Sequence, residues 1–137
     1  MLRLKVRLER ADGKRSVETI GVASSGFTGL TPEILIPASI AGTLKLHEVG
    51  KPESHVKVTA DGRIIEFLKY RNTVKVYLIA EDRVEGPVLC SVLVTPYSRY
   101  VLLNDKLLSK LRIVLLDFGE GIWCFRDELG RRERKSI

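Results

Sequence analysis

The chain has 137 residues, of which 45% are hydrophobic and 29% are charged, and its formal net charge is +6. This composition excludes a disordered chain, and the length suits one domain with a sizeable core. No apolar run approaches the roughly 20 residues of a membrane-spanning helix, and basic residues from Arg3 to Arg10 interrupt any signal-peptide core after Met1. We therefore expect a cytoplasmic protein with no membrane partner.

The positive charge lies at the two ends of the chain. Residues 1–15 carry six basic and two acidic groups, and residues 126–137 carry five basic and three acidic groups, which gives +4 and +2. Cys90 and Cys124 both occur in apolar, strand-like runs, so we expect buried free thiols in a reducing compartment. A disulfide is the alternative, because intracellular proteins of hyperthermophiles are an exception to that rule. The chain has no Gln, two Asn and one Met, a scarcity of thermolabile residues that indicates a thermophile.

From the first residues, apolar and basic side chains alternate, which is typical of strands with one buried face. The same kind of pattern recurs along most of the chain and is interrupted by Gly-rich turns such as Asp12-Gly13. Strands are expected over residues 2–8, 16–23, 33–36, 56–59, 64–68, 73–80, 88–95, 112–118 and 122–125.

Helical signals are few and short. Pro37 suits the first turn of a helix over 38–46, and Asn104 is a good N-cap for a helix over 105–111. The residues from Arg126 onward are charged and are expected to fray. Many short strands with two short helices predict an all-β fold, a closed or nearly closed β-barrel over residues 1–125 followed by a charged C-terminal tail over 126–137.

Several apparent motifs carry no chemistry. Asp117-Phe118-Gly119 copies the magnesium triplet of protein kinases, but no other kinase motif accompanies it. His47 and His55 are the only histidines and lie far in sequence from both cysteines, so no convincing metal-ligand set exists. We expect neither a metal nor a cofactor.

One constellation of residues does resemble a known family. The segment Ser24-Ser25-Gly26-Phe27-Thr28-Gly29 follows a strand and precedes an apolar segment with Pro37. This order is similar to that of the retropepsin-like aspartic proteases, which carry Asp-Thr/Ser-Gly-Ala/Phe-Thr/Ser-Gly on such a loop. Residues 60–63 look like the tip of the family's flap hairpin, and residues 102–108 resemble its second hallmark. The resemblance covers Val17 to Phe125 and implies a retropepsin-like barrel.

The chain departs from the family at two positions. Ser24 stands where the family has its catalytic Asp, and Asn104 replaces the Gly of the second hallmark. A hydroxyl cannot hold charge at a working pH, so it cannot replace the carboxylate that activates water. No catalytic residue of the family is intact, and we expect a non-catalytic member.

By resemblance, such a member is a homodimer whose terminal strands pair between chains, and its flap covers a cleft that can accept an extended peptide or protein segment. The residues expected to bind that peptide are Ser24, Ser25, Gly26, Asp61, Gly62 and Arg63.

Two alternatives stay open. The chain is an active aspartic-type endopeptidase if Asp61, Asp105 or Asp117 supplies a different acid. It is a nucleic-acid-binding barrel if Arg3, Lys5 and Arg7 follow phosphates along one strand, although aromatic residues for base stacking are sparse. We favour the non-catalytic peptide-binding hypothesis and disfavour nucleic acid.

Overall fold

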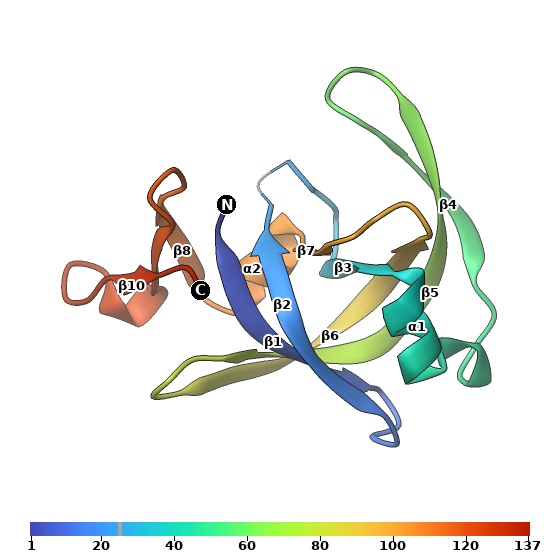
Figure 1. The fold of residues 1–137 in the computed structure, drawn as a ribbon, viewed down its shortest axis with the longest axis horizontal. Helices are drawn as coiled ribbons and strands as arrows, with labels where there is room; N and C mark the ends of the chain where they lie inside the picture. The colour runs from blue at the N-terminus through green and yellow to red at the C-terminus, as the bar shows by residue number, and fades with distance from the viewer. Residues whose placement is uncertain (25) are drawn as a thin grey trace.

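A computed structural model describes residues 1–24 and 26–137. Most of these residues lie in strands, accompanied by two short α-helices and two 3-10 helices (Figure 1). The strands are β1 (Arg3–Arg10), β2 (Ser16–Ala23), β3 (Glu33–Pro37), β4 (Glu53–Val58), β5 (Ile64–Ile79), β6 (Val84–Thr95), β7 (Val101–Leu103), β8 (Ile113–Asp117), β9 (Ile122–Phe125) and β10 (Arg134–Lys135). The helices are α1 (Ala38–Leu44), η1 (Leu46–Glu48), α2 (Asp105–Lys110) and η2 (Arg126–Glu128).

Six strands close into a β-barrel in the order β1-β2-β7-β3-β6-β5, and the pairing of β1 with β5 completes the circle. The predicted closed barrel is thereby confirmed. Two of its neighbouring pairs, β2 with β7 and β3 with β6, run parallel, while the other pairs are antiparallel. Alternate residues of β1 point inward, as the period-two pattern predicts, and pack in one buried core with the inner faces of β5 and β6.

β4 and the first half of β5 form a hairpin that extends away from the barrel. It is the green hairpin standing above the barrel in Figure 1, and we call residues 53–68 the flap. The blue loop after β2 projects on the same side of the barrel in that view. The fold therefore places a long hairpin and residues 26–29 on one side of the molecule.

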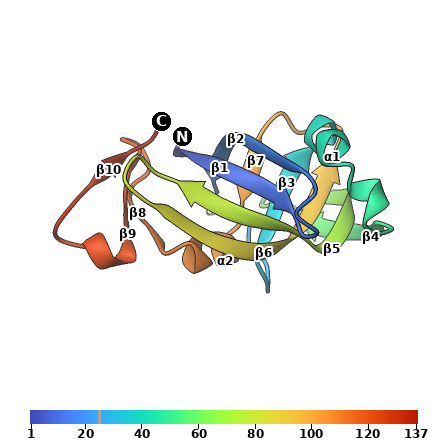
Figure 2. The same ribbon diagram turned by 90° about the horizontal axis from the view of Figure 1, so that it is seen from below.

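The last strands form a separate sheet in the order β10-β9-β8. Figures 1 and 2 both show this sheet at one end of the barrel and α1 at the other. Residues 126–137 do not fray, so that expectation is wrong. Arg134 has a buried side chain and holds the tail to the barrel through Asp82, in the turn between β5 and β6, while it pairs within the tail with Glu128 of η2.

We call Arg132, Arg134, Asp82 and Glu128 the tail cluster. The Arg134 guanidinium donates two bonds to Asp82, at 2.7 and 3.0 Å, and two to Glu128, at 2.8 and 2.7 Å. It also lies over the rings of Trp123 and Phe125. Sequence patterning overlooked this arrangement because a run of charges is normally solvated, whereas here paired charges and aromatic faces order the segment.

Other expectations need smaller corrections. β7 was not expected as a strand, and β5 is one strand where two were expected, with Asn72 at φ 48° within its irregular middle. Pro37 ends β3 and caps α1 instead of lying in its first turn. Asn104 caps α2 as predicted, since its side chain accepts a hydrogen bond from the Leu107 N–H. No helix in the described part of the chain is long and apolar enough to span a membrane.

Candidate functional site

A cleft of about 470 Å³ lies between the flap and the loop that follows β2. Its floor is apolar, because a small second core of Leu35, Phe67 and Leu93 lies beneath it with Phe27 and Leu102 packed alongside. The cleft is lined by Ser24, Gly26, Phe27, Thr28, Leu35, Lys57, Val58, Thr59, Ala60, Ile65, Phe67, Leu93 and Leu102. A hollow with an apolar floor and hydroxyl groups at its rim suits an extended chain.

The loop side of the cleft is where Ser24 and Gly26 lie. The Ser24 backbone N–H donates to the carbonyl oxygen of Leu103 in β7 at 3.3 Å, so the loop begins directly beside the segment that leads into α2. Ser25 was expected to bind peptide and lies outside the described residues. The cleft thus brings together two of the six residues predicted to bind peptide.

Asn104 anchors the 27–33 segment from below. Its side chain is fully buried, and its Oδ1 accepts hydrogen bonds from the N–H groups of Glu33 and Leu107 at 3.0 and 2.9 Å. Its Nδ2 donates to the Thr31 carbonyl oxygen at 3.0 Å. Asn104, which stands where the resembled family has Gly, therefore has a structural role, because its side-chain amide holds α2 and the 27–33 segment together.

Asp105 ties the same loop at a second point. Its Oδ1 accepts from the Gly29 N–H at 3.2 Å, while its own N–H donates to the Phe27 carbonyl oxygen at 3.1 Å. Partial burial opposes ionisation, but the N–H groups of Lys106 and Gly29 prevail and lower the pKa of Asp105. Asp105 is thus an ionised anchor for the loop.

A buried carboxylate, Glu33, lies beneath the loop and is approached by two lysines. Lys57 Nζ on the flap is 3.0 Å from Glu33 Oε1, and Lys69 Nζ on β5 is 3.1 Å from Oε2. We call Lys57, Glu33 and Lys69 the flap cluster. A Cβ at position 29 would lie 2.6 Å from Glu33 Oε1, so any residue larger than Gly there would have to displace the Glu33 side chain.

Lys57 also bridges the flap and the loop across the cleft. Its Nζ donates to the Thr28 carbonyl oxygen at 2.9 Å and lies 5.2 Å from the centre of the Phe27 ring. The ammonium group is close to Glu33 Oε1 but not aligned for a hydrogen bond, and that oxygen has no hydrogen-bond partner among the described residues. Lys57 is therefore held by a carbonyl, a ring face and the charge of Glu33 together.

Burial and the charge of Lys69 lower the pKa of His55, on the flap beside this cluster, and Glu33 opposes that effect only in part. Burial is also the main cause that raises the pKa of the Cys90 thiol to about 12, with a smaller contribution from Glu33. Cys90 and Cys124 are both buried and free, as the sequence predicts. Neither thiol is a nucleophile at neutral pH.

The flap tip carries the other three residues predicted to bind peptide. Gly62 has φ 83° and closes the turn, and Asp61 bonds to Thr59 and pairs with Arg63 at 2.8 Å. The bonds from Thr59 and the Arg63 backbone N–H lower the pKa of Asp61. Among the residues described, the cleft lining includes 57–60 of the flap and not 61–63.

The candidate acids for an active peptidase do not converge. Asp61 is at the flap tip, Asp105 holds the Gly29 N–H, and Asp117 ends β8 and accepts a bond from the Glu120 N–H. None of the three lines the cleft in the described part of the chain. Within residues 1–24 and 26–137, no group of three or more His, Cys, Asp and Glu side chains is arranged to hold a metal.

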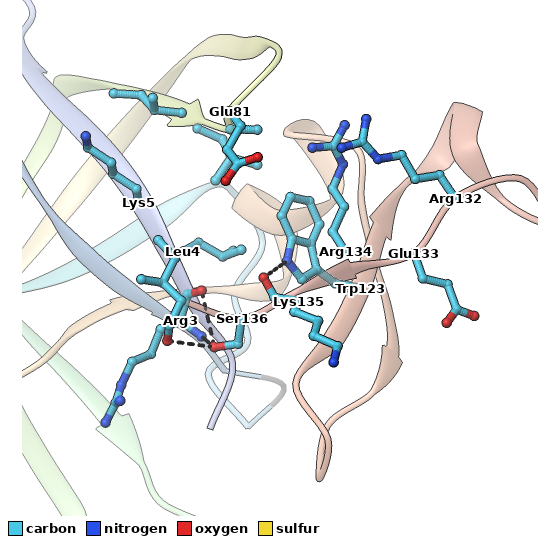
Figure 3. A pocket seen from close by; sticks show the side chains of 14 residues that line it. Arg3, Leu4, Lys5, Glu81, Trp123, Arg132, Glu133, Arg134, Lys135 and Ser136 are labelled. Atoms are coloured by element: carbon cyan, nitrogen blue, oxygen red, sulfur yellow. Dashed lines mark hydrogen bonds between the residues drawn. The ribbon is translucent and has the colours of Figure 1, made fainter.

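A second hollow, of about 620 Å³, separates β1 from the C-terminal sheet (Figure 3). The Trp123 indole N–H donates to the Lys135 carbonyl oxygen at 3.4 Å, and Ser136 bonds to the backbone of Arg3. Its most buried cation, Arg134, is fully engaged with Asp82 and Glu128. This hollow is a junction between the barrel and the tail.

The basic face of β1 is partly neutralised. Lys5 pairs with Glu18 at 3.4 Å, and Arg7 pairs with Glu9 at 3.2 Å while it lies over the Tyr77 ring. These pairings reduce the positive potential that a nucleic-acid backbone would need along that strand.

Comparison with protein-family models gives no match for this sequence, and comparison with curated proteins gives none either. The function of the chain is therefore inferred from the geometry of the cleft. Sequence reasoning missed the flap cluster, although one signal was present: Glu33 is a charged residue at the start of a strand that is otherwise apolar.

Proposed function

We propose that the chain is a non-catalytic, retropepsin-like homodimer that binds an extended peptide beneath its flap. The observation that carries the proposal is the cleft between the flap and the 24–29 loop, which presents the hydroxyl of Ser24 and no carboxylate among its described lining residues. The closed barrel, the hairpin over the cleft and the loop after β2 follow the order that the resemblance implies. Backbone pairing with an extended peptide needs no acid.

The terminal strands, which by resemblance pair between two chains, are engaged within this chain, because β1 pairs with β2 and β5 and β10 pairs with β9. The edge of β8 is therefore the contact that we propose for a dimer. In the described residues β8 pairs only with β9, so its other edge is free, and Leu116 and Phe118 are 42% and 43% exposed beside it. Free edges with exposed apolar side chains favour pairing with another chain. We further propose a cytoplasmic setting, which the two buried free thiols support.

A peptidase assay tests the absence of catalysis. The protein is incubated with a casein digest between pH 3 and pH 8, and new peptide termini are measured by mass spectrometry. We expect none, because the described lining of the cleft holds no carboxylate that could activate water beside Ser24. Cleavage that disappears in Asp61→Asn, Asp105→Asn or Asp117→Asn would overturn the proposal, and a Ser24→Asp variant shows whether restoring one acid suffices.

Sedimentation equilibrium tests the dimer. Leu116→Lys places a charge beside the free edge of β8 and is expected to shift the protein toward the monomer. Leu89→Lys is the matched control, because Leu89 is 47% exposed but lies on β6 in the barrel wall. A monomeric natural protein, or equal effects of both substitutions, contradicts pairing through β8.

A further inference from the structure

The lining of the cleft carries a single charge. Of the described lining residues, only Lys57 belongs to a charged residue type, and the others have apolar side chains, are glycine or carry the hydroxyls of Ser24, Thr28 and Thr59. The ammonium group of Lys57 is on the flap side, and its side chain is 23% exposed. A ligand beneath the flap therefore meets one positive charge above an apolar floor.

That positive charge is not balanced by its neighbours. Glu33 supplies one negative charge to two lysines, so the flap cluster has a formal charge of +1. Lys69 is the more enclosed partner, with a side chain 10% exposed against 23% for Lys57. The two ammonium groups share the single carboxylate at similar distances, so one positive charge stays unneutralised, and Lys57 is the more exposed of the two lysines to which a further anion can come.

Nearby carboxylates do not supply the missing charge. Asp105 is engaged by the Gly29 N–H and by Lys106, and Asp61 is paired with Arg63 at the flap tip. Ser24 contributes a neutral hydroxyl at the position where an acid would repel an incoming anion. The cleft thus has a net positive charge and no ionised acid among its described lining residues.

We propose that the cleft selects acidic peptides, in which a Glu or Asp side chain pairs with Lys57 while a nearby large apolar side chain contacts Leu35, Phe67 and Leu93. This inference rests on the proposed function, since it names the class of peptide that the same site takes. Successive residues of an extended chain are about 3.3 Å apart and alternate in direction. An acid directed at the flap and an apolar neighbour directed at the floor fit that alternation.

A phage-displayed library of random heptapeptides tests the selection, because it offers acidic, basic and neutral sequences to the cleft at once. The library is panned on the natural protein, on Lys57→Met and on Lys51→Met, a control that removes one positive charge from the exposed loop before β4. We expect Glu and Asp to be enriched beside large apolar residues on the natural protein and on Lys51→Met. The enrichment is expected to disappear on Lys57→Met.

The recovered peptide that binds best is then synthesised in two forms, with Glu and with Gln at the acidic position, and binding is measured by calorimetry. One ion pair at a partly exposed site is worth about 1 kcal/mol, so we expect the Glu form to bind about fivefold more tightly at low salt. The difference is expected to fall below about twofold in 0.5 M NaCl. Lys57→Arg, which keeps the charge, is expected to retain the preference.

The outcomes distinguish a failure of the selection for acidic peptides from a failure of peptide binding itself. Binders without enrichment of acids, or equal affinity of the Glu and Gln peptides for the natural protein, overturn the acidic selection and leave peptide binding intact. No binders on any of the three proteins, with panning on an unrelated peptide-binding domain as the positive control, overturn peptide binding itself. The Glu and Gln comparison uses only the natural protein, so it decides the question even when Lys57→Met does not fold.

Discussion

The tail cluster and the flap cluster are both groups of paired charges that hold a chain segment against the barrel, yet they differ in charge balance. In the tail cluster, two arginines face two carboxylates. In the flap cluster, two lysines face the single carboxylate of Glu33. The balanced cluster needs no further partner, whereas the unbalanced one retains a cation that faces an open cleft.

The chemistry of the cations reinforces this difference. Arg134 presents a rigid fork that bonds two carboxylates and stacks on two aromatic rings, so its position is fixed by many contacts at once. Lys57 is a point charge on a flexible stem, and it can turn toward a ligand without breaking the Lys69–Glu33 pair. Structural and ligand-responsive ion pairs can therefore be told apart within one small protein.

The largest expected effect comes from removing Arg134. An Arg134→Met substitution leaves Asp82 and Glu128 without their main partner and exposes the rings of Trp123 and Phe125. Removing one member of a largely buried ion-pair network costs about 3 kcal/mol. We expect a loss of that size in the free energy of unfolding, measured by urea denaturation.

Arg132→Met is the control for the loss of charge alone. Its side chain is 48% exposed and, in the part of the chain that the structure describes, pairs only with Asp82, so we expect a change below about 1 kcal/mol. Similar losses for the two variants would show that the tail is held by general charge and not by the Arg134 fork.

Acid should weaken the tail cluster before it weakens the barrel core. Hydrogen bonds from Arg134 lower the pKa of Glu128 to about 2, against an ordinary value of 4.5. A depressed pKa contributes stability that is complete above about pH 5 and is lost as the pH falls from 4.5 through 2. We expect the urea midpoint of the natural protein to fall in this range.

The same titration on Glu128→Gln separates this group from the other carboxylates. The variant is expected to be less stable at pH 7 and to lose less stability between pH 5 and pH 3. Parallel curves for the two proteins would mean that Glu128 does not contribute to the acid response.

Much of the barrel could be predicted from the sequence because its strand boundaries depend on residues that are close together in the chain. The boundaries of β2 (Ser16–Ala23) and β9 (Ile122–Phe125) follow from alternating or apolar runs between clear turns, and the cap of α2 follows from one residue type, Asn104. β7 escaped prediction because a three-residue strand has too few positions to show a period. The ordered conformation of the tail could not be predicted, because it depends on the ion pair between Arg134 and Asp82, which are far apart in sequence.

The candidate site was predictable only in outline. The 24–29 loop and the flap follow from small residues and a hairpin turn, and both border the cleft. The alternation of Lys57 with Val56 and Val58 favours a lysine that faces solvent, yet the alternation is inverted on the flap. Val56 and Val58 are 53% and 68% exposed, while the Lys57 side chain is 23% exposed and lies against Glu33, which is buried. Which face of a strand is buried is decided by the partner beneath it, and that information is not local.

The smallest expected effect on stability comes from Lys57→Met, which converts the flap cluster into the balanced pair of Glu33 and Lys69. Because Lys57 is partly exposed and Glu33 keeps a partner, we expect the free energy of unfolding to change by less than about 1 kcal/mol. The flap, however, loses its bond to the Thr28 carbonyl oxygen and its contact with Phe27. Hydrogen exchange should therefore become faster in peptides covering residues 53–68 and stay unchanged in β1. Lys51→Met controls for the charge, and unchanged exchange in the flap of Lys57→Met would show that this lysine does not hold the flap against the loop.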